Sequence, residues 1–169
     1  MNCWRVTKYN PLHREDGANS PYTVDTWTQV EDLQESKVSV EEYKKVEDSY
    51  VNACMLFAKD TGLDTVKVVD FINDMDSSEV LIEHKLDLPD RRDELEEIPV
   101  EELADLVRKN LRGILYCKIE GENSFYIHFG YDFYMYIGSE FSCESAINLV
   151  EESGLFVEKF VSPYLDIED

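Results

Sequence analysis

The chain has 169 residues, 43% of them hydrophobic, and a formal net charge of −21 from 37 acids against 16 bases. The apolar content excludes a disordered chain, and the length suits a single domain over residues 1–169. The charge argues against direct binding to nucleic acid or to an anionic membrane, because both require a basic surface. It fits a basic protein partner, or solubility alone.

The first stretch of the chain alternates weakly from Cys3 to Tyr9 and is interpreted as a strand that Pro11 ends. No signal-peptide core and no membrane span are expected in the sequence. Four cysteines are widely spaced and form no CxxC pair, which is typical of reduced thiols in the cytoplasm and predicts no zinc site. A polar loop follows the first strand, and "TWTQVEDL" (26–33) is interpreted as a short strand.

A long helix is predicted between Ser39 and Gly62. Ser39 caps it, Glu42 completes a capping box three residues later, and Gly62 is a natural stop. Apolar residues recur at three- and four-residue spacing on one face. They are Val40, Tyr43, Val46, Tyr50, Ala53, Cys54, Phe57 and Ala58.

The middle of the chain is strongly acidic, with 16 acids and 6 bases between Asp60 and Lys109. "DTVKVVDFI" (64–72) reads as a strand because it is rich in β-branched residues. A short helix is expected around Glu79 to Leu86, and a second good helix should begin with Pro99 as its first residue and end at Gly113. We interpret Glu96 and Glu97 in this region as acids that contact a partner.

The same region holds acids that resemble metal ligands at first sight. They are Asp70, Asp74, Asp76 and Glu79, but they lack the glycine and the spacing of a calcium loop. Solvated acids are the better interpretation, so we expect neither a metal nor a cofactor. No phosphate-binding or dinucleotide-binding glycine motif occurs in the sequence.

The aromatic stretch "SFYIHFGYDFYMYIGSEF" (124–141) predicts a three-strand antiparallel meander over about 114–138. With three-residue turns at 121–123 and 130–132, Ile119 opposes Phe125 and Phe129 opposes Phe133. Every odd position then lies on one apolar face. These positions are Leu115, Cys117, Ile119, Phe125, Ile127, Phe129, Phe133, Met135 and Ile137.

The even positions of the meander give an amphipathic face, and they are the main candidates for partner binding. The face consists of Tyr116, Lys118, Tyr126, His128, Tyr134 and Tyr136. Tyrosine tolerates both water and burial and is enriched at protein interfaces. The predicted cross-strand order places His128 between Tyr116 and Tyr134. Two interpretations stay open: the face binds a partner, or a helix of the same chain covers it.

The chain is expected to finish with a helix capped by Ser142, a strand in "LFVEKFV" (155–161) and an acidic tail. Adjacent strands beside separate helices indicate the α+β class, with an antiparallel sheet and helices packed mainly on one face. His128 and Asp132 could pair as a base and its orienting carboxylate, but no nucleophile accompanies them. Because Cys117 points to the opposite face, a structural role for His128 is the better interpretation, and we expect no catalytic residue.

Several phrases along the chain are similar to those of a group of small acidic cytosolic bacterial proteins without assigned activity. The phrases are "WRVTKYNP", "TWT", "EEYKKVEDSYVNA", "HFGYDFYMYIGS" and "SGLFVEKFVSPY". They span most of the chain, contain no catalytic signature, and imply no active site. In general style the chain also resembles immunity proteins, which neutralise toxins.

The leading interpretation is a non-enzymatic acidic binding protein of the bacterial cytoplasm, in the form of an immunity or inhibitor protein that neutralises a basic toxin or enzyme. Acids would steer the partner, and aromatic anchors would hold it. One alternative is a nucleic-acid mimic that occupies a DNA-binding enzyme. Another is a small enzyme or ligand-binding protein that uses the tyrosines and His128, which a deep pocket around His128 would favour.

Overall fold

The computed structural model describes residues 1–13, 27–73, 78–86 and 97–165. Within these ranges the chain has the predicted α+β architecture, with a seven-stranded antiparallel sheet. The strands are β1 (Asn2–Thr7), β2 (Thr65–Asn73), β3 (Glu97–Pro99), β4 (Leu115–Gly121), β5 (Phe125–Phe129), β6 (Met135–Ser139) and β7 (Phe156–Lys159). The α-helices are α1 (Val40–Thr61), α2 (Ser78–Glu83), α3 (Leu103–Leu111) and α4 (Glu144–Glu152), and η1 (Pro11–His13), η2 (Val30–Leu33) and η3 (Val100–Glu102) are 3₁₀ turns.

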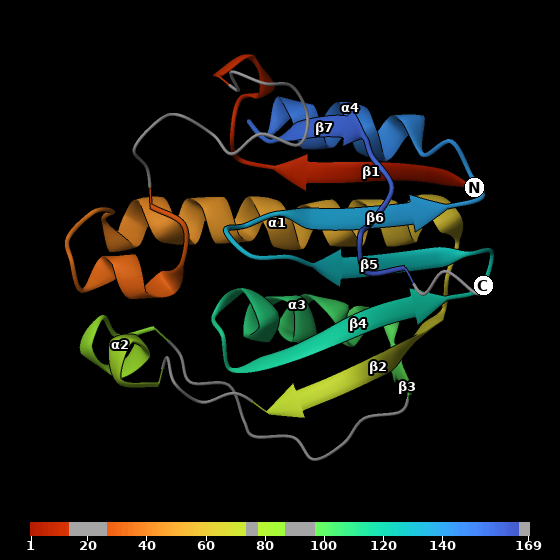
Figure 1. Ribbon diagram of the computed structural model, residues 1–169. Helices are drawn as coiled ribbons and strands as arrows, with labels where there is room; N and C mark the ends of the chain where they lie inside the picture. Colours follow the sequence, from red (N-terminus) through yellow and green to blue (C-terminus); the bar gives the residue numbers. More distant parts are fainter. Residues whose placement is uncertain (14–26, 74–77, 87–96, 166–169) are drawn as a thin grey trace.

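The sheet runs in the order β3-β2-β4-β5-β6-β1-β7, so the first strand of the chain lies between the last two. Figure 1 shows α1, α3 and α4 behind the sheet, α1 at its centre. We call this the helix face and the opposite side the front face. That helices pack mainly on one face is as predicted, while the single-domain assignment stays a prediction.

The long helix α1 forms where the sequence predicts it. The Ser39 hydroxyl accepts a hydrogen bond from the Glu42 N–H at 3.1 Å, which satisfies one of the N–H groups left open at a helix start. Gly62 ends the helix with a φ of 67°, a left-handed conformation that glycine adopts without a steric penalty.

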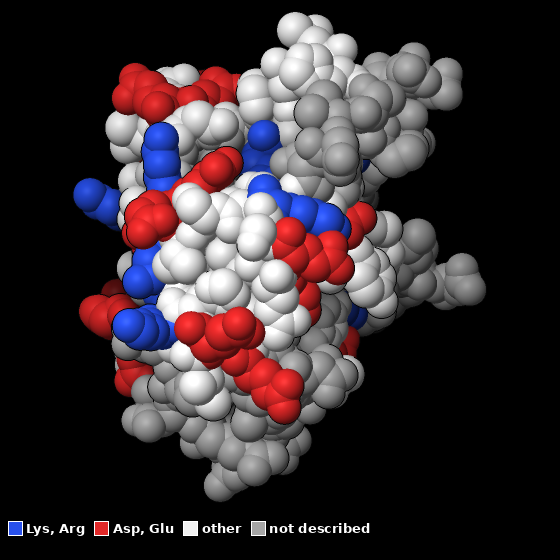
Figure 2. Space-filling view, turned by 90° about the vertical axis from the view of Figure 1, so that its left-hand side faces the viewer, with Lys and Arg blue, Asp and Glu red and all other residues white. Residues whose placement is uncertain are grey.

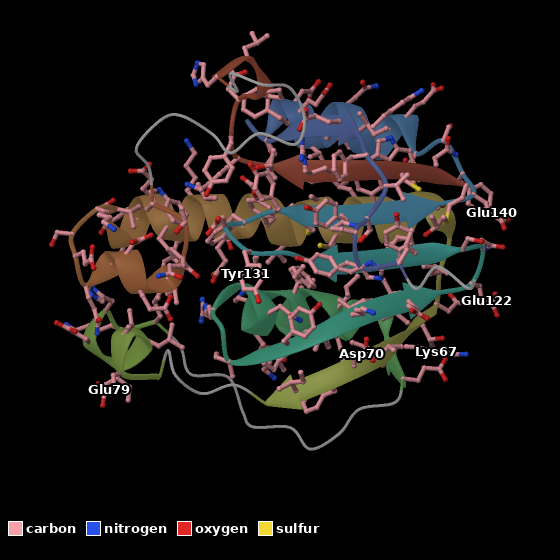
Figure 3. All side chains as sticks on the ribbon, viewed as in Figure 1. Lys67, Asp70, Glu79, Glu122, Tyr131 and Glu140 are labelled. Atoms are coloured by element: carbon pink, nitrogen blue, oxygen red, sulfur yellow. The ribbon has the colours of Figure 1, made fainter. Side chains whose placement is uncertain are left out.

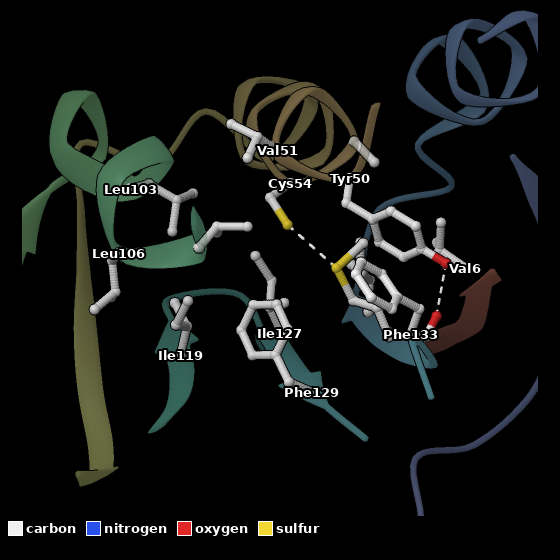
Figure 4. Packing of buried hydrophobic residues seen from close by; sticks show 14 of the residues in the cluster. Val6, Tyr50, Val51, Cys54, Leu103, Leu106, Ile119, Ile127, Phe129 and Phe133 are labelled. Carbon is white, nitrogen blue, oxygen red and sulfur yellow. Dashed lines mark hydrogen bonds between the residues drawn. The ribbon is translucent and has the colours of Figure 1, made fainter. Parts of the chain in front are cut away.

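The odd face of the meander is buried against these helices, as predicted. Figure 4 shows Ile119, Ile127 and Phe129 beneath α1 and α3, where they meet Leu103 and Leu106. Cys54 of α1 contacts the sulfur of Met135 at 3.3 Å. The sheet and the long helix therefore share one core.

The turns of the meander differ from the prediction. Gly121 pairs with Phe125 and Ile119 with Ile127, so the first loop covers residues 122–124. Phe129 pairs with Met135, so the second loop covers residues 130–134. Each register moves by two residues, and because side chains alternate with a period of two, the faces remain as predicted.

Three further expectations need correction. Residues 30–33 form a 3₁₀ turn and no strand, since the Asp32 carboxylate accepts the N–H groups of Thr28 and Gln29 at 2.6 and 3.2 Å and so stabilises a turn. Pro99 has extended geometry, ends β3 and precedes η3, so it is not the first residue of a helix.

The start of α4 is the third correction. The helix begins after Cys143, which has a φ of 48°, and no side chain of Ser142 or Cys143 caps it. Instead the carboxylate of Asp60, on α1, accepts the N–H of Ala146 at 2.9 Å. The cap is therefore a tertiary contact, which no local motif could indicate.

Candidate functional site

The C-terminal segment, residues 160–165, covers half of the front face. Figure 1 shows it descending from β7 in front of β6 and β5. Phe160 and Tyr164 both pack against Tyr136, each with ring centroids 5.8 Å apart. The N–H of Phe160 donates to the carbonyl of Cys3 at 3.1 Å, which ties the segment to β1. Of the two interpretations left open by the sequence, cover by the same chain holds for this half of the face, and the C-terminal segment supplies it in place of a helix.

His128 lies beneath this segment and is 1% exposed. Its Nδ1 lies 2.8 Å from the hydroxyl oxygen of Ser162, and its ring stacks on Tyr126 with centroids 4.5 Å apart. A serine hydroxyl on a histidine nitrogen is also the contact that activates a nucleophile. Both residues are buried and neither lines a cavity described below, so this contact ties the C-terminal segment to β5.

The three central residues of the predicted partner face are therefore buried: Tyr126, His128 and Tyr136. Burial raises the pKa of the Tyr126 phenol, and it raises that of Tyr136, with Tyr164 adding to the shift. Both phenols are neutral at physiological pH. The burial argues against direct contact between these three side chains and a partner.

Gly138 explains how Tyr126 becomes buried. The two residues are opposite each other on β5 and β6. A Cβ on Gly138 would lie 2.0 Å from the Tyr126 ring, so the ring occupies the space that any side chain would need.

The predicted order of neighbours on this face also changes. His128 pairs with Tyr136, while Tyr134 belongs to the loop before β6. The ring of Tyr134 packs on Tyr9 at 5.6 Å. This rearrangement follows directly from the two-residue shift in register.

Arg5 is an unpredicted member of the covered face. Its guanidinium lies 4.3 Å from the ring centroid of Phe160 and 5.2 Å from that of Tyr134. Two of its nitrogens donate to one carboxylate oxygen of Glu158, at 3.0 and 3.2 Å. Two rings and a carboxylate therefore enclose a buried cation, an arrangement in which cation–π attraction is strongest.

The other half of the front face is open to a pocket of about 470 Å³, which we call the aromatic pocket. It is lined by Ile72, Tyr116, Phe129, Gly130, Tyr131 and Tyr164. These residues come from β2, β4, β5, the loop 130–134 and the C-terminal segment. The volume falls in the range of ligand pockets, and most of the lining is apolar.

A β-bulge brings Ile72 into this pocket. Val69 pairs with Lys118 but Ile72 pairs with Tyr116, so β2 holds one extra residue between the two pairs. Asp70 lies in the bulge with a φ of 53°. The insertion reverses the alternation of the strand, turns Ile72 to the front face beside Tyr116, and leaves it 58% exposed.

Tyr131 stands at the rim of the pocket and is 85% exposed (Figure 3). Its loop is fixed by Phe133, whose carbonyl accepts the Tyr50 hydroxyl at 2.6 Å and whose ring packs on Trp27 at 5.0 Å. Phe133 has a φ of 58°, which is strained for a bulky side chain. A well-anchored loop thus presents a large aromatic side chain to solvent.

Lys118, another predicted partner residue, is buried beside the pocket. Its ammonium lies 2.8 Å from a carboxylate oxygen of Asp70, whose side chain is 54% exposed. Burial raises the pKa of Tyr116, Tyr164 and Asp70 raise it further, and Lys118 opposes the shift. Asp70 therefore places negative charge near the pocket.

Glu97 is the one of the two predicted acidic contacts that lies among the described residues. Glu97 lies on β3, is exposed, and pairs in register with Lys67; its carboxylate accepts the Thr65 hydroxyl. Glu96 lies outside the described residues.

Cavities also lie away from the front face. A groove of about 730 Å³ follows the outer side of α1, between η3 and α4, with Met55, Leu56 and Leu149 among its lining. A smaller pocket of about 310 Å³ contains Lys8, whose ammonium lies 3.8 Å from the Trp27 ring centroid and contacts the Trp27 carbonyl. Burial lowers the pKa of Lys8 to about 8, against the attraction of Glu42 and Asp32.

No group of three His, Cys, Asp or Glu side chains among the described residues is placed to hold a metal ion. In the same ranges no helix is long and apolar enough to cross a membrane. Comparisons with protein-family models, with curated proteins and with solved structures return no significant match. The resemblance noted in the sequence stays a prediction.

Proposed function

We propose that the chain is a non-enzymatic binding protein of the bacterial cytoplasm that takes up a basic protein, as an immunity or inhibitor protein does. The observation that carries the proposal is the aromatic pocket, in which exposed Tyr131 and Ile72 stand on an anchored frame within a chain of net charge −21. Exposed aromatic and aliphatic side chains around a pocket are the usual anchors of an interface.

The distribution of charge supports a basic partner. Arg5, Lys109, Arg112 and Lys118 are buried, each in an ion pair with an acid of the same chain. These bases contribute little to the field outside the protein, so an approaching molecule meets mainly the acids. Such a field steers a basic partner and raises its rate of association.

The nucleic-acid mimic is less well supported. It needs acids spaced like phosphates over a long face, whereas the end of the molecule in Figure 2 carries acidic and basic side chains around an uncharged centre. A deep pocket around His128 would have favoured the enzyme alternative, and His128 lines none of the cavities described above.

The test is affinity capture from the source cells with three forms of the protein: wild type, Tyr131→Ser, and Phe141→Ser as a matched control with an exposed aromatic residue elsewhere. We expect wild type and the control to retain a basic protein that moderate salt releases. Tyr131→Ser should retain much less of it. Capture of the same protein by all three forms, independent of salt, would contradict the proposal.

A further inference from the structure

The aromatic pocket contains rings from three parts of the chain and lacks a cation among its described lining. Tyr116, Tyr131 and Tyr164 contribute three phenol rings. The face of each ring carries partial negative charge, which attracts a cation that approaches it.

The chain already binds one guanidinium, that of Arg5, between aromatic rings of its own front face. Arg5 lies between the rings of Phe160 and Tyr134, and Glu158 accepts two of its N–H groups. A planar guanidinium stacks on aromatic faces and keeps N–H groups for a carboxylate. In the covered half of the front face, two aromatic rings thus form a cage that the guanidinium of Arg5 occupies.

The open half offers the same two components. Its rings are those of the aromatic pocket, and a carboxylate, that of Asp70, lies close enough to the pocket to add to the rise that burial causes in the pKa of Tyr116. One oxygen of Asp70 lies 2.8 Å from the Lys118 ammonium, and the Asp70 side chain is 54% exposed.

We propose that the aromatic pocket is a cage for an arginine side chain of the basic protein partner. The inference rests on the proposed function and adds to it the residue type that the partner inserts. Charge complementarity favours this occupant over an apolar one, because a guanidinium gains from both the rings and the acids. An apolar side chain gains only from burial.

The test uses N-acetyl-argininamide as the probe and N-acetyl-citrullinamide as its neutral counterpart, which has nearly the same shape. Chemical shifts of the tyrosine ring protons are followed by NMR during titration. We expect the arginine probe to bind with a dissociation constant of about 1–10 mM, in the range of a fragment of this size, and citrulline to bind at least about 5-fold more weakly.

Three variants locate the site. Tyr131→Ala should weaken arginine binding about 5-fold, while Tyr131→Phe, which keeps the ring, and Phe141→Ala should leave it unchanged. Because Tyr131 is largely exposed, these replacements leave the fold intact, which circular dichroism checks.

Two results would overturn the proposed cage. One is equal binding of the arginine and citrulline probes. The other is the absence of tyrosine ring shifts with the arginine probe at about 50 mM, which is about five times the upper end of the expected dissociation constant. Such a failure is separate from the proposed function, because a basic partner captured through Tyr131 would still stand if the pocket took an apolar side chain.

Discussion

Replacing Glu47 by Gln should destabilise the protein by about 3–5 kcal/mol. Glu47 is buried on α1, and its two carboxylate oxygens accept N–H groups of Arg112 at 2.7 and 2.8 Å. Arg108 donates to the same carboxylate at 2.9 Å. Each bond is charge-assisted, and without the carboxylate the buried guanidinium of Arg112 keeps its charge while losing the group that compensates it.

The neighbouring residue provides the control. Asp48 also contacts Arg108 at 2.9 Å, but its side chain is 60% exposed. Water replaces that contact when it is lost, so Asp48→Asn should cost under about 1 kcal/mol. Both variants would be measured by urea denaturation at pH 7, where linear extrapolation gives the free energy of unfolding.

A double variant separates the ion pair from the packing. Glu47→Leu with Arg112→Met removes both charges, so it should recover much of the stability lost by Glu47→Gln alone. If Glu47→Gln costs under about 1 kcal/mol, or the double variant is less stable than the single one, the reasoning about an uncompensated buried charge is wrong.

Four other outcomes are expected. Phe129→Ala, in the core, should cost about 3–5 kcal/mol in urea denaturation, and a cost under about 1 kcal/mol would mean that the site is not packed as described. Burial lowers the pKa of Lys8 from 10.5 to about 8, so between these pH values the unfolded chain binds a proton that the folded chain lacks. The free energy of unfolding of the wild type should therefore rise by about 1–2 kcal/mol relative to Lys8→Met from about pH 7.5 to 10.5, since solvent screening reduces the full value, and parallel profiles would refute this. Ser162→Ala should cost about 1 kcal/mol by loss of the contact to His128 while leaving capture of the partner intact; loss of capture at unchanged stability would give this pair a functional role. With a purified partner, Glu97→Lys should slow association and Tyr131→Ala should speed dissociation in stopped-flow experiments, and an association rate that does not change with salt would remove the steering role.

Local signals in the sequence account for the elements that were predicted correctly. The limits of α1 follow from Ser39 and Gly62, which act on groups within their own turn. The apolar face of the meander was correct although the pairing register of both hairpins differs from the prediction by two residues. A shift of two residues moves neighbours along the strand but leaves each side chain on its face.

The candidate site depends on contacts that are distant in sequence. "SPYLDIED" is typical of an acidic tail. Nothing local in it indicates that Ser162 contacts His128 of β5 or that Tyr164 packs on Tyr136 of β6. The bulge at Asp70, which turns Ile72 to the front face, also has no local signal, because the sequence around it is an ordinary run of β-branched residues. A glycine inside a strand, Gly138, was the available sign that a ring lies close to the backbone.

The internal ion pairs connect stability with the proposed function. Lys109 and Lys118 are buried, while their partners Asp105 and Asp70 remain about half exposed. Each pair therefore hides a positive charge and leaves part of a negative one at the surface. The field outside the protein is thus more acidic than an even placement of the same 37 acids and 16 bases would give. Arg5 follows the same rule on the front face, where it is enclosed by rings, so the open rings of the aromatic pocket are left for a cation that another molecule supplies.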